Sequence, residues 1–243
     1  MSKQMKTRIE SYEVTPDGTL KISALFRIFQ KIAGDDLDSA GLTYDALRDS
    51  GIVFVLTKMS VEFMDNIGVY DEINVITRPR GCKGAVYIRD YDVYKGDTRV
   101  AYCSSQWVII DFSTRKILRP STIAERFLLK DDFDDIYPIE NKKFRFKSED
   151  LTKIDTRRIY YSQLDRNEHM NNTFYPDMVL DYLPCSFRDG LKGKKVTVHY
   201  TTEITAGEEM DIFTGISGEG FCIMAVNTAT EKEVFSALVT INN

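Results

Sequence analysis

The stretch DRNEHMNN, Asp165–Asn172, stands directly before an amphipathic segment and is a dense cluster of polar residues. Its eight residues combine carboxylates, amides and one of the chain's two histidines. Apolar residues then recur at helical spacing, at Phe174, Tyr175, Met178, Val179, Tyr182 and Leu183. We expect a helix over 173–183, capped by Asn171 or Asn172, with Pro176 in its first turn. A helix start presents backbone amides to an oxygen that becomes an anion, so the pattern predicts a reactive site here.

The N-terminal part of the chain has the same outline. An apolar stripe over Leu20–Ala33 predicts a long helix, capped by Thr19 and ended by Gly34. We expect a strand over Arg8–Val14 before it and a short helix over Thr43–Asp49 after it. Alternating and β-branched runs then predict an antiparallel meander, over Val53–Leu56, Val61–Phe63, Asp71–Thr77, Ala85–Tyr94 and Arg99–Ile110, with a short piece near Ile117.

The outline is repeated after Asp155, which indicates an α+β duplication. Strands are expected over Ile159–Gln163, Val196–Tyr200, Met210–Ile216, Gly220–Val226 and Val234–Ile241. The predicted pairing aligns 70–75 with 207–212, Asp17 with Asp165, Thr19 with Asn167, Lys21 with His169, and Asn66 with Glu203. The polar cluster is therefore expected in the second half alone. We predict domains over 1–125 and 156–243, joined by a charged linker or crossover over 126–155.

Composition excludes several functional classes. The net charge of −5 argues against nucleic acid as a partner, because phosphate binding requires a basic face. The chain has neither a secretory apolar region nor a run long enough to cross a membrane, so we expect a cytoplasmic protein that does not bind membranes. Its four cysteines lack metal-binding spacing, and we expect no metal and no cofactor.

Leu164–Asn172, followed by Tyr175, resembles the catalytic loop of the fatty acyl-ACP thioesterases of plants and bacteria, Leu-Asp-x-Asn-x-His-Val-Asn-Asn followed by Tyr, with Met170 in place of Val. Tyr200 and Glu203 fit the family's Tyr-x-x-Glu-Cys element, although Ile204 replaces the cysteine. The resemblance implies a tandem hot-dog fold, in which each half is a helix wrapped by a curved antiparallel sheet. The two sheets would join edge to edge.

Carried over by residue, the resemblance implies Asp165, Asn167, His169 and Glu203 as the catalytic set. Thioester hydrolysis needs an activated water and a stabilised oxyanion. We assign Asn167 and His169 to the carbonyl or the water, Glu203 to the general base, and Asp165 to orienting its neighbours or holding the water. With Ile204 beside Glu203 and no Gly-x-Ser-x-Gly motif, direct attack by water is the simpler mechanism.

The expected substrate is fatty acyl-ACP, whose hydrolysis to free fatty acid and carrier protein would end chain elongation. The resemblance places the acyl slot chiefly in the N-terminal half, and we name four aromatic candidates for its lining, Phe26, Phe29, Phe54 and Trp107. A basic rim would attract the acidic acyl carrier protein. The candidate clusters are Arg157 with Arg158, Lys192 with Lys194 and Lys195, and Lys142 and Lys143 with Arg145 and Lys147. The duplicated chain could act as a monomeric pseudo-dimer or form a homodimer.

Two other functions compete with this interpretation. A hot-dog thioesterase acting on acyl-CoA would use the same chemistry. A non-catalytic acyl-binding sensor would keep the pocket without turnover, but the presence of all four polar positions in one half argues against it. A hot-dog dehydratase is disfavoured, because the His-Phe-Pro type of loop is missing.

Overall fold

One antiparallel sheet of ten strands organises the described part of the chain in the computed structural model, which covers residues 2–119, 121, 137, 144, 146, 150–217 and 220–241. The strands of the N-terminal half are β1 (Lys3–Arg8), β2 (Ile52–Phe63), β3 (Glu72–Lys83), β4 (Val86–Lys95) and β5 (Thr98–Asp111). Those of the C-terminal half are β6 (Thr152–Arg158), β7 (Lys194–Tyr200), β8 (Glu209–Ser217), β9 (Gly220–Asn227) and β10 (Glu233–Ile241).

The strand order is symmetric about the centre of the sheet. It runs β1-β3-β4-β5-β2-β7-β10-β9-β8-β6, so each half has the same order read from the middle outward. At the junction, β2 pairs antiparallel with β7, with Ser60 opposite Thr197, and their hydroxyl oxygens lie 2.8 Å apart. The duplication and the edge-to-edge joining predicted from the sequence are therefore confirmed as a double hot-dog fold.

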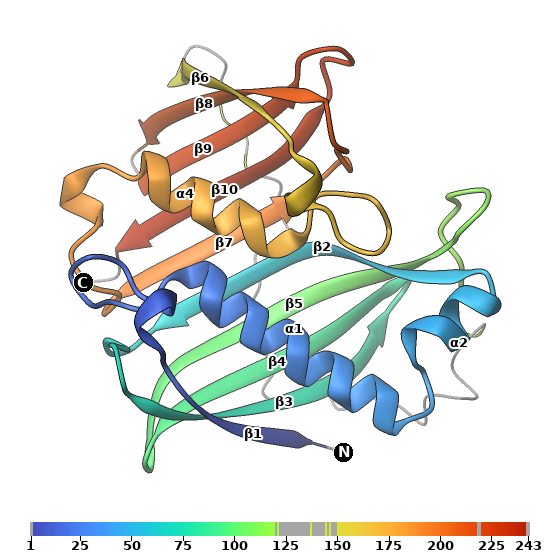
Figure 1. Cartoon of the computed structure of the whole chain (residues 1–243), viewed down its shortest axis with the longest axis horizontal. Coiled ribbons are helices and arrows are strands. Elements are labelled where there is room, and N and C mark those ends of the chain that lie inside the picture. Colours follow the sequence, from blue (N-terminus) through green and yellow to red (C-terminus); the bar gives the residue numbers. More distant parts are fainter. Residues whose placement is uncertain are drawn as a thin grey trace.

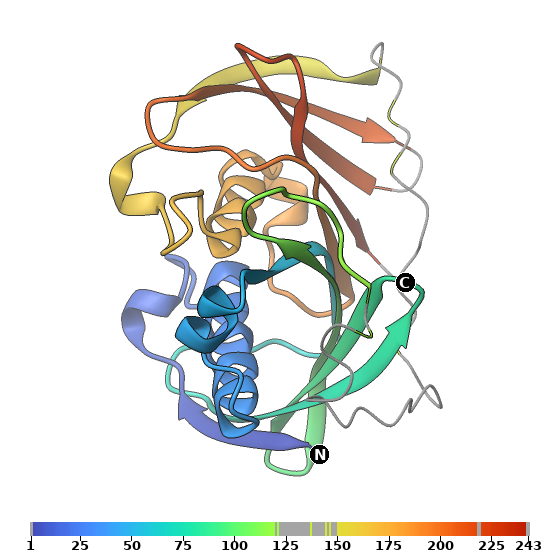
Figure 2. The same cartoon turned by 90° about the vertical axis from the view of Figure 1, so that its right-hand side faces the viewer.

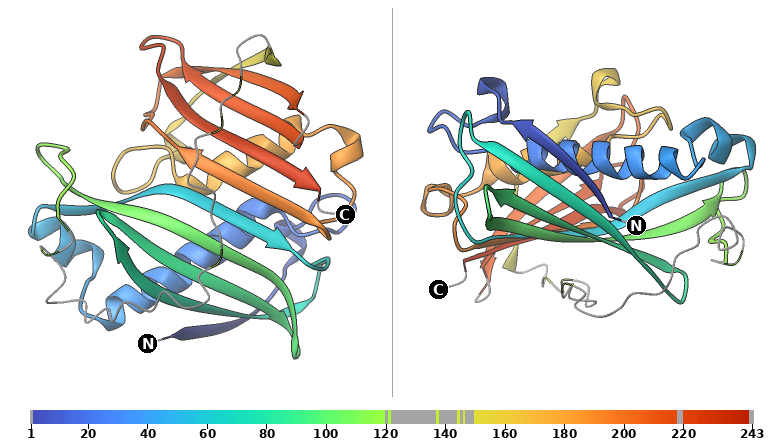
Figure 3. Two further views of the ribbon diagram at one scale, coloured as in Figure 1. Left: turned by 180° about the vertical axis from the view of Figure 1, so that it is seen from behind. Right: turned by 90° about the horizontal axis from the view of Figure 1, so that it is seen from below.

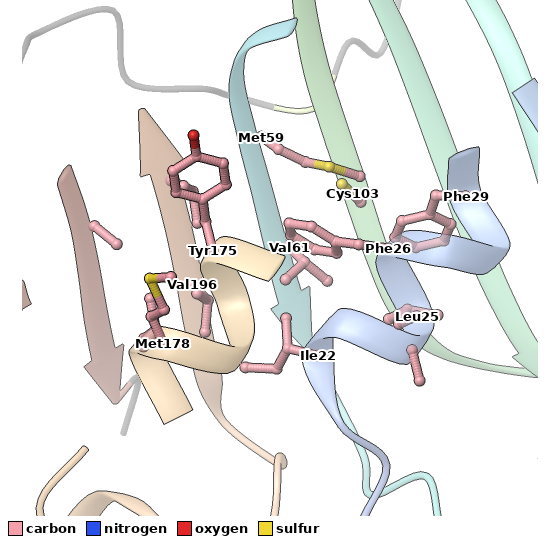
Figure 4. Packing of buried hydrophobic residues seen from close by; sticks show 14 of the residues in the cluster. Ile22, Leu25, Phe26, Phe29, Met59, Val61, Cys103, Tyr175, Met178 and Val196 are labelled. Atoms are coloured by element: carbon pink, nitrogen blue, oxygen red, sulfur yellow. The ribbon is translucent and has the colours of Figure 1, made fainter. Parts of the chain in front are cut away.

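Two α-helices lie on the same face of this sheet, α1 (Ile22–Ser39) in the first half and α4 (Tyr175–Tyr182) in the second, as Figures 1 and 3 show. Their apolar residues pack on β2 and β7 at the centre, where Figure 4 shows Ile22 and Phe26 of α1 near Tyr175 and Met178 of α4. The core is continuous across both halves, because buried residues of both helices and of the two central strands belong to one cluster. At the surface, Arg27 on α1 pairs with Asp177 on α4 at 3.2 Å.

The first helix is longer than predicted. It continues through Gly34 to Ser39, and Gly41, with φ +76°, follows its end. The prediction of Gly34 as the stop was wrong because Leu37 extends the apolar stripe by one further turn from Ala33. Thr19 is not the cap either, since Lys21 occupies that position without a side-chain cap. The short second helix, α2 (Tyr44–Asp49), is confirmed, and Thr43 accepts a hydrogen bond from the amide of Ala46 at 3.2 Å.

The two outer strands were misplaced by the sequence pattern. The structure has β1 and β6 where no strand was expected, and the predicted strands over 8–14 and 159–163 contain single 3-10 turns, η1 (Ser11–Glu13) and η3 (Tyr161–Gln163). The misplaced strands are edge strands with mostly polar side chains, a composition that protects an exposed edge and removes the alternating apolar signal.

Most of the predicted linker over 126–155 lies outside the described residues, and β6 begins inside it at Thr152. Two described residues of the segment contact the sheet. Tyr137 donates a hydrogen bond to the buried Asp92, and Phe144 stacks on His199 with ring centroids 4.2 Å apart. The segment thus meets the sheet on β4 and β7. Figure 2 shows α1 and α4 together on one side of the sheet.

None of the helices among the described residues is both long and apolar enough to span a bilayer.

Candidate active site

The loop before α4 is a tight hairpin that carries Asp165, Asn167 and His169. Leu164 and Met170 form an isolated bridge, and the amide of Asp165 donates to the carbonyl of His169 at 2.8 Å. The Asp165 carboxylate accepts a hydrogen bond from the amide of Asn167 at 2.7 Å. Glu168 completes the turn with φ +65°, a left-handed conformation that is unusual outside glycine. Asp165 therefore orders the backbone on which Asn167 and His169 stand.

The N-terminal half contains the same hairpin without these side chains. The bridge Val14–Leu20 matches Leu164–Met170, and the amide of Thr15 donates to the carbonyl of Thr19 at 2.8 Å. Thus Thr15, Asp17 and Thr19 occupy the positions of Asp165, Asn167 and His169. The predicted pairing of Asp17 with Asp165, Thr19 with Asn167 and Lys21 with His169 was wrong by two residues, because it relied on the shared aspartate rather than on the turn.

The counterpart of Glu203 was paired correctly. The amide of Leu20 donates to Ile67 and that of Met170 donates to Ile204, both through backbone bonds, which aligns Asn66 with Glu203. Asn66 has a different task. Its Oδ1 accepts hydrogen bonds from the amides of Leu191 and Lys192, at 2.6 and 2.9 Å, and so it holds a loop of the C-terminal half.

Gly190 in this loop makes a testable contact. It has φ +59°, and a Cβ placed there would lie 2.7 Å from Asn66 Oδ1. Gly190→Ala should lower the free energy of unfolding by more than the ~1–2 kcal/mol of left-handed strain alone. The matched control is Gly41→Ala, which has φ +76° and nothing within 4 Å of the added carbon. Denaturant unfolding of both variants measures the difference, and equal losses would show that the Asn66 contact contributes nothing.

Glu203 lies in the loop after β7 and faces the hairpin. Its Oε2 is 3.6 Å from His169 Nε2, too far for a hydrogen bond. The same oxygen accepts a hydrogen bond from the Arg115 guanidinium, and both side chains are a little over one third exposed. Arg115 belongs to the N-terminal half, so an arginine of that half binds the Glu203 carboxylate of the C-terminal half.

Arg115 is presented by a well-ordered turn. The Asp111 carboxylate accepts hydrogen bonds from the amides of Ser113 and Thr114 at 3.1 and 2.7 Å, and the amide of Arg115 donates to the Asp111 carbonyl at 2.9 Å. The hydrogen bonds to the carboxylate, led by those from the amide and the hydroxyl of Thr114, lower the pKa of Asp111. Arg115 itself has φ +59°. The turn therefore fixes the direction from which Arg115 reaches Glu203.

The environment of His169 favours its neutral form. Burial lowers the pKa of the imidazole, and the charge of Arg115 lowers it further. Asp165, Glu168 and Glu208 act in the opposite direction, but the net shift of the pKa is downward. Because the imidazole is neutral, Glu203 pairs with the Arg115 guanidinium and not with a charged His169.

Asn167 is connected to the N-terminal half through α2. Its Oδ1 accepts a hydrogen bond from the Tyr44 hydroxyl at 3.0 Å, and the Arg48 guanidinium donates to the same hydroxyl oxygen at 3.2 Å. Arg166, next in sequence, stacks over the Tyr44 ring at 4.0 Å and pairs with Asp45 at 2.9 Å. The first half therefore contacts the site at two points, the hairpin through α2 and Glu203 through the Arg115 turn.

The helix start after the hairpin is capped as expected, but its backbone amides are less available to bind an oxyanion than predicted. Asn171 accepts hydrogen bonds from the amide and hydroxyl of Thr173, both at 2.9 Å, and the amide of Phe174 donates to the Asn171 carbonyl at 3.0 Å. A 3-10 turn, η4 (Asn172–Phe174), precedes α4, and Pro176 lies in the first turn of α4. Because these amides are already bonded, the side-chain amide of Asn167 is the better oxyanion donor.

Two cavities meet at Asn167. The larger, about 370 Å³, lies in the N-terminal half between α1, α2 and the sheet, and most of its lining is apolar, including Ala33, Leu37, Leu42, Leu47, Ile52, Ile88 and Trp107. The smaller, about 80 Å³, is lined by all four predicted catalytic residues, Asp165, Asn167, His169 and Glu203. Val53, Phe54 and Asn167 line both cavities. A volume of a few hundred cubic ångströms is typical of small-molecule sites.

The aromatic residues predicted to line the slot divide into two pairs. Phe54 and Trp107 line the larger cavity, and Trp107 Nε1 donates to the Ser105 hydroxyl at 2.8 Å, which fixes the indole. Phe26 and Phe29 line neither cavity and are at most 2% exposed in the core, where Phe29 stacks on Tyr91 with centroids 4.5 Å apart. They lie one and two turns before Ala33 in α1, the helix that lines the cavity with Gln30, Ala33 and Leu37.

Of the predicted basic clusters, the two that lie in the described part of the chain do not line these cavities. Arg157 pairs with Asp181 at 2.8 Å, and the buried Lys194 donates to the carbonyl of Asp189 at 2.7 Å. Lys192 lies 3.8 Å from Asp65. The third cluster, Lys142, Lys143, Arg145 and Lys147, is outside the described residues. The cations beside the site come instead from separate segments, as Arg48, Arg115 and Arg166.

The double hot-dog sheet, with one polar hairpin set against an apolar cavity, defines a single-chain tandem hot-dog protein. Two family models match it, the acyl-ACP thioesterase N-terminal domain over residues 1–126 and the acyl-ACP thioesterase C-terminal domain over residues 147–242. The chain therefore belongs to the acyl-ACP thioesterase family.

Individual relatives are distant. The chloroplastic palmitoyl-acyl carrier protein thioesterase of Arabidopsis thaliana is 24% identical over 231 residues, which cover 86% of this chain and 54% of the relative. The dodecanoyl-[acyl-carrier-protein] hydrolase of Cinnamomum camphora is 26% identical, over 86% of this chain and 58% of the relative. The chain thus spans somewhat more than half the length of these two proteins.

Solved structures establish the fold over nearly the whole chain. An acyl-ACP thioesterase from Bacteroides thetaiotaomicron superposes with a TM-score of 0.84 at 22% identity, covering 99% of this chain and 98% of the other. The 12:0-ACP thioesterase from Umbellularia californica gives a TM-score of 0.85 at 20% identity, covering 98% and 96%.

Proposed function

We propose that this protein hydrolyses the thioester of fatty acyl groups carried by acyl carrier protein, releasing free fatty acid. The observation that carries this proposal is the shared wall between the two cavities. An acyl chain in the apolar cavity would end at Asn167, which also lines the small polar cavity with His169 and Glu203. Burial of a chain supplies about 0.8 kcal/mol per methylene, so the large cavity can provide binding while the small one provides chemistry.

The mechanism follows from the hydrogen-bonding capacity of each group. Glu203 accepts a proton from a water molecule, and the water oxygen attacks the thioester carbon. Asn167 Nδ2 donates a hydrogen bond to the carbonyl oxygen as it becomes an anion, and neutral His169 orients the water or the carbonyl. The tetrahedral intermediate then expels the sulfur as the carbon–sulfur bond breaks, and the proton held by Glu203 passes to the thiolate, which regenerates the carboxylate. Asp165 acts indirectly, through the hairpin backbone.

No cysteine belongs to the lining of either cavity in the described part of the chain. Cys103 and Cys222 are buried elsewhere, and burial raises the pKa of the Cys103 thiol. Ile204, where the family often has cysteine, is 1% exposed and its carbonyl accepts the amide of Met170. These placements support direct attack by water over a covalent cysteine intermediate.

The carrier protein is proposed as the partner because cations surround the site. Arg48, Arg115 and Arg166 are exposed and come from three segments around the two cavities. An acidic carrier would be attracted by this group even though the whole chain is acidic, since steering depends on the local field.

Release of free fatty acid from a panel of acyl-ACPs, with matched acyl-CoAs in parallel, tests the function. We expect a higher kcat/KM for the carrier-protein esters and a preference among chain lengths set by the larger cavity. Hydrolysis of CoA esters alone would keep the mechanism and replace the partner. Tight acyl binding with no release from any ester would contradict the proposed function and favour an acyl sensor.

The pH dependence of hydrolysis should reflect the lowered pKa of His169. Since the active form has a neutral imidazole, the acid limb of kcat/KM is expected below the ordinary histidine value of 6.5. Arg115→Met removes one of the two causes of the lowered pKa, so the limb should move to higher pH. The comparison of kcat/KM against pH in native and variant protein measures the shift.

Two further variants isolate the effect of the charge at Arg115. Arg115→Lys keeps the charge and should leave the limb near its native position. Lys116→Met removes a cation from the next position in the same turn and should also leave it unchanged. An acid limb that does not move in Arg115→Met would show that Arg115 has no electrostatic influence on the reacting groups.

A further inference from the structure

We propose that Tyr44 and Arg48, on α2 of the N-terminal half, are positioning residues that fix the orientation of the Asn167 amide. This inference rests on the proposed function, because it assigns both residues a role through Asn167. An asparagine side chain has two ends of nearly equal shape, one accepting and one donating hydrogen bonds. Only the orientation with Nδ2 toward the small cavity can stabilise an oxyanion, so something must select it.

The hydrogen bonds around Tyr44 make this selection. A guanidinium can only donate, so Arg48 occupies an acceptor position on the Tyr44 oxygen at 3.2 Å. The hydroxyl hydrogen is then available to donate, and Asn167 Oδ1 lies 3.0 Å away. A reversed amide would present Nδ2 to an oxygen that already accepts from Arg48. The carbonyl of Arg166, at 3.2 Å, is a second acceptor near the same hydroxyl, but Asn167 Oδ1 is the nearer of the two.

Packing keeps the three groups in place. Tyr44 is half-buried at the wall of the larger cavity, with the Arg166 guanidinium over its ring at 4.0 Å. Arg48 lies over the ring of Phe112 at 3.7 Å, and the amide of Phe112 donates to the carbonyl of Gly51 just after α2. The backbone of Asn167 is fixed independently by Asp165. With the backbone and Oδ1 both held, Nδ2 has a single direction.

The geometry gives α2 a function that the second half does not reproduce. The catalytic hairpin belongs to the C-terminal half, whereas the group that orients its amide lies between α1 and β2 in the N-terminal half. The N-terminal half thus contributes to the reaction in addition to forming the acyl cavity. Loss of the Tyr44 hydroxyl should lower kcat while leaving acyl binding, and hence KM for a slow substrate, nearly unchanged.

A double-mutant cycle tests the proposal with an acyl thioester under single-turnover conditions. Tyr44→Phe keeps the ring, its stacking and the cavity wall, and it should lower the rate about tenfold, the usual effect of one lost hydrogen bond. In an Asn167→Ala background the same change should cost nothing further, because no amide remains to be oriented. Tyr12→Phe, at an exposed tyrosine of the same half, is the matched control and should be silent.

Each outcome separates the two proposals. An equal loss from Tyr44→Phe in both backgrounds would overturn the positioning role, since Tyr44 would then act directly or through the fold. Absence of hydrolysis by the native protein would contradict the proposed function instead. A spectroscopic readout tests the orientation in either case: the Asn167 side-chain NH2 signals, assigned by their loss in Asn167→Ala, should shift in Tyr44→Phe. Unshifted signals would overturn the inference.

Discussion

Glu203→Gln is expected to lower turnover by about a hundredfold to ten-thousandfold, the range associated with loss of a general base. The amide keeps the size and shape of the carboxylate but cannot accept a proton from water. It also removes the charge that Arg115 contacts and that lies 3.6 Å from His169. The larger cavity, proposed to hold the acyl chain, is formed by other residues, so acyl binding should remain close to native.

Two measurements make this prediction decisive. Initial rates of fatty acid release give the loss in turnover, and binding of a non-hydrolysable acyl thioether shows whether the cavity is intact. Glu168→Gln is the local control, because the Glu168 charge also acts on the pKa of His169, whereas Glu168 does not line the small cavity. Native turnover in Glu203→Gln with normal acyl binding would exclude water activation by this residue.

The central part of the fold was accessible from the sequence because its signals are local. Strands β2, β4, β5, β9 and β10 are rich in apolar and β-branched residues, and α1 carries a regular stripe. The edge strands β1 and β6 were missed because their exposure removes the apolar pattern that marks a strand. The end of α1 was missed for a related reason: one glycine was given more weight than the leucine a turn later.

The candidate site divides in the same way. Asp165, Asn167 and His169 lie in one hairpin, so a short motif was enough to bring them together, and Glu203 followed from a second motif. Tyr44, Arg48 and Arg115 carry no motif and lie in the other half of the chain, far from that hairpin in the sequence. They reach it only because β2 pairs with β7 and places the first half beside the second. Contacts of this kind depend on tertiary structure and leave no periodic trace.

The cavity illustrates a further limit of sequence patterns. Phe26, Phe29, Phe54 and Trp107 are all apolar positions on regular elements, and nothing local distinguishes a cavity wall from a packed core. The distinction arises from α2, which follows the end of α1. The larger cavity lies between α2 and the sheet, where Phe54 and Trp107 line it. Phe26 and Phe29 lie where α1 packs directly on the sheet.

Asn167→Ala is expected to lower turnover by about a hundredfold to a thousandfold, the usual loss for one oxyanion donor. The reason is structural as well as chemical, because the nearby amides of Thr173 and Phe174 are bonded within the helix cap and cannot substitute for it. The loss should appear in kcat rather than KM, since the hydrogen bond strengthens only when the carbonyl oxygen becomes an anion.

Asn167→Asp provides the matched variant for this experiment. Aspartate has the same volume and can still accept the Tyr44 hydrogen bond, but it has no donor to offer the oxyanion. If donation by Nδ2 is what Asn167 contributes, the aspartate variant should lose at least as much turnover as the alanine variant while unfolding at the native temperature. Near-native turnover in a folded aspartate variant would contradict this role. Oxyanion stabilisation would then have to come from another donor, and His169 on the same hairpin lines the small cavity.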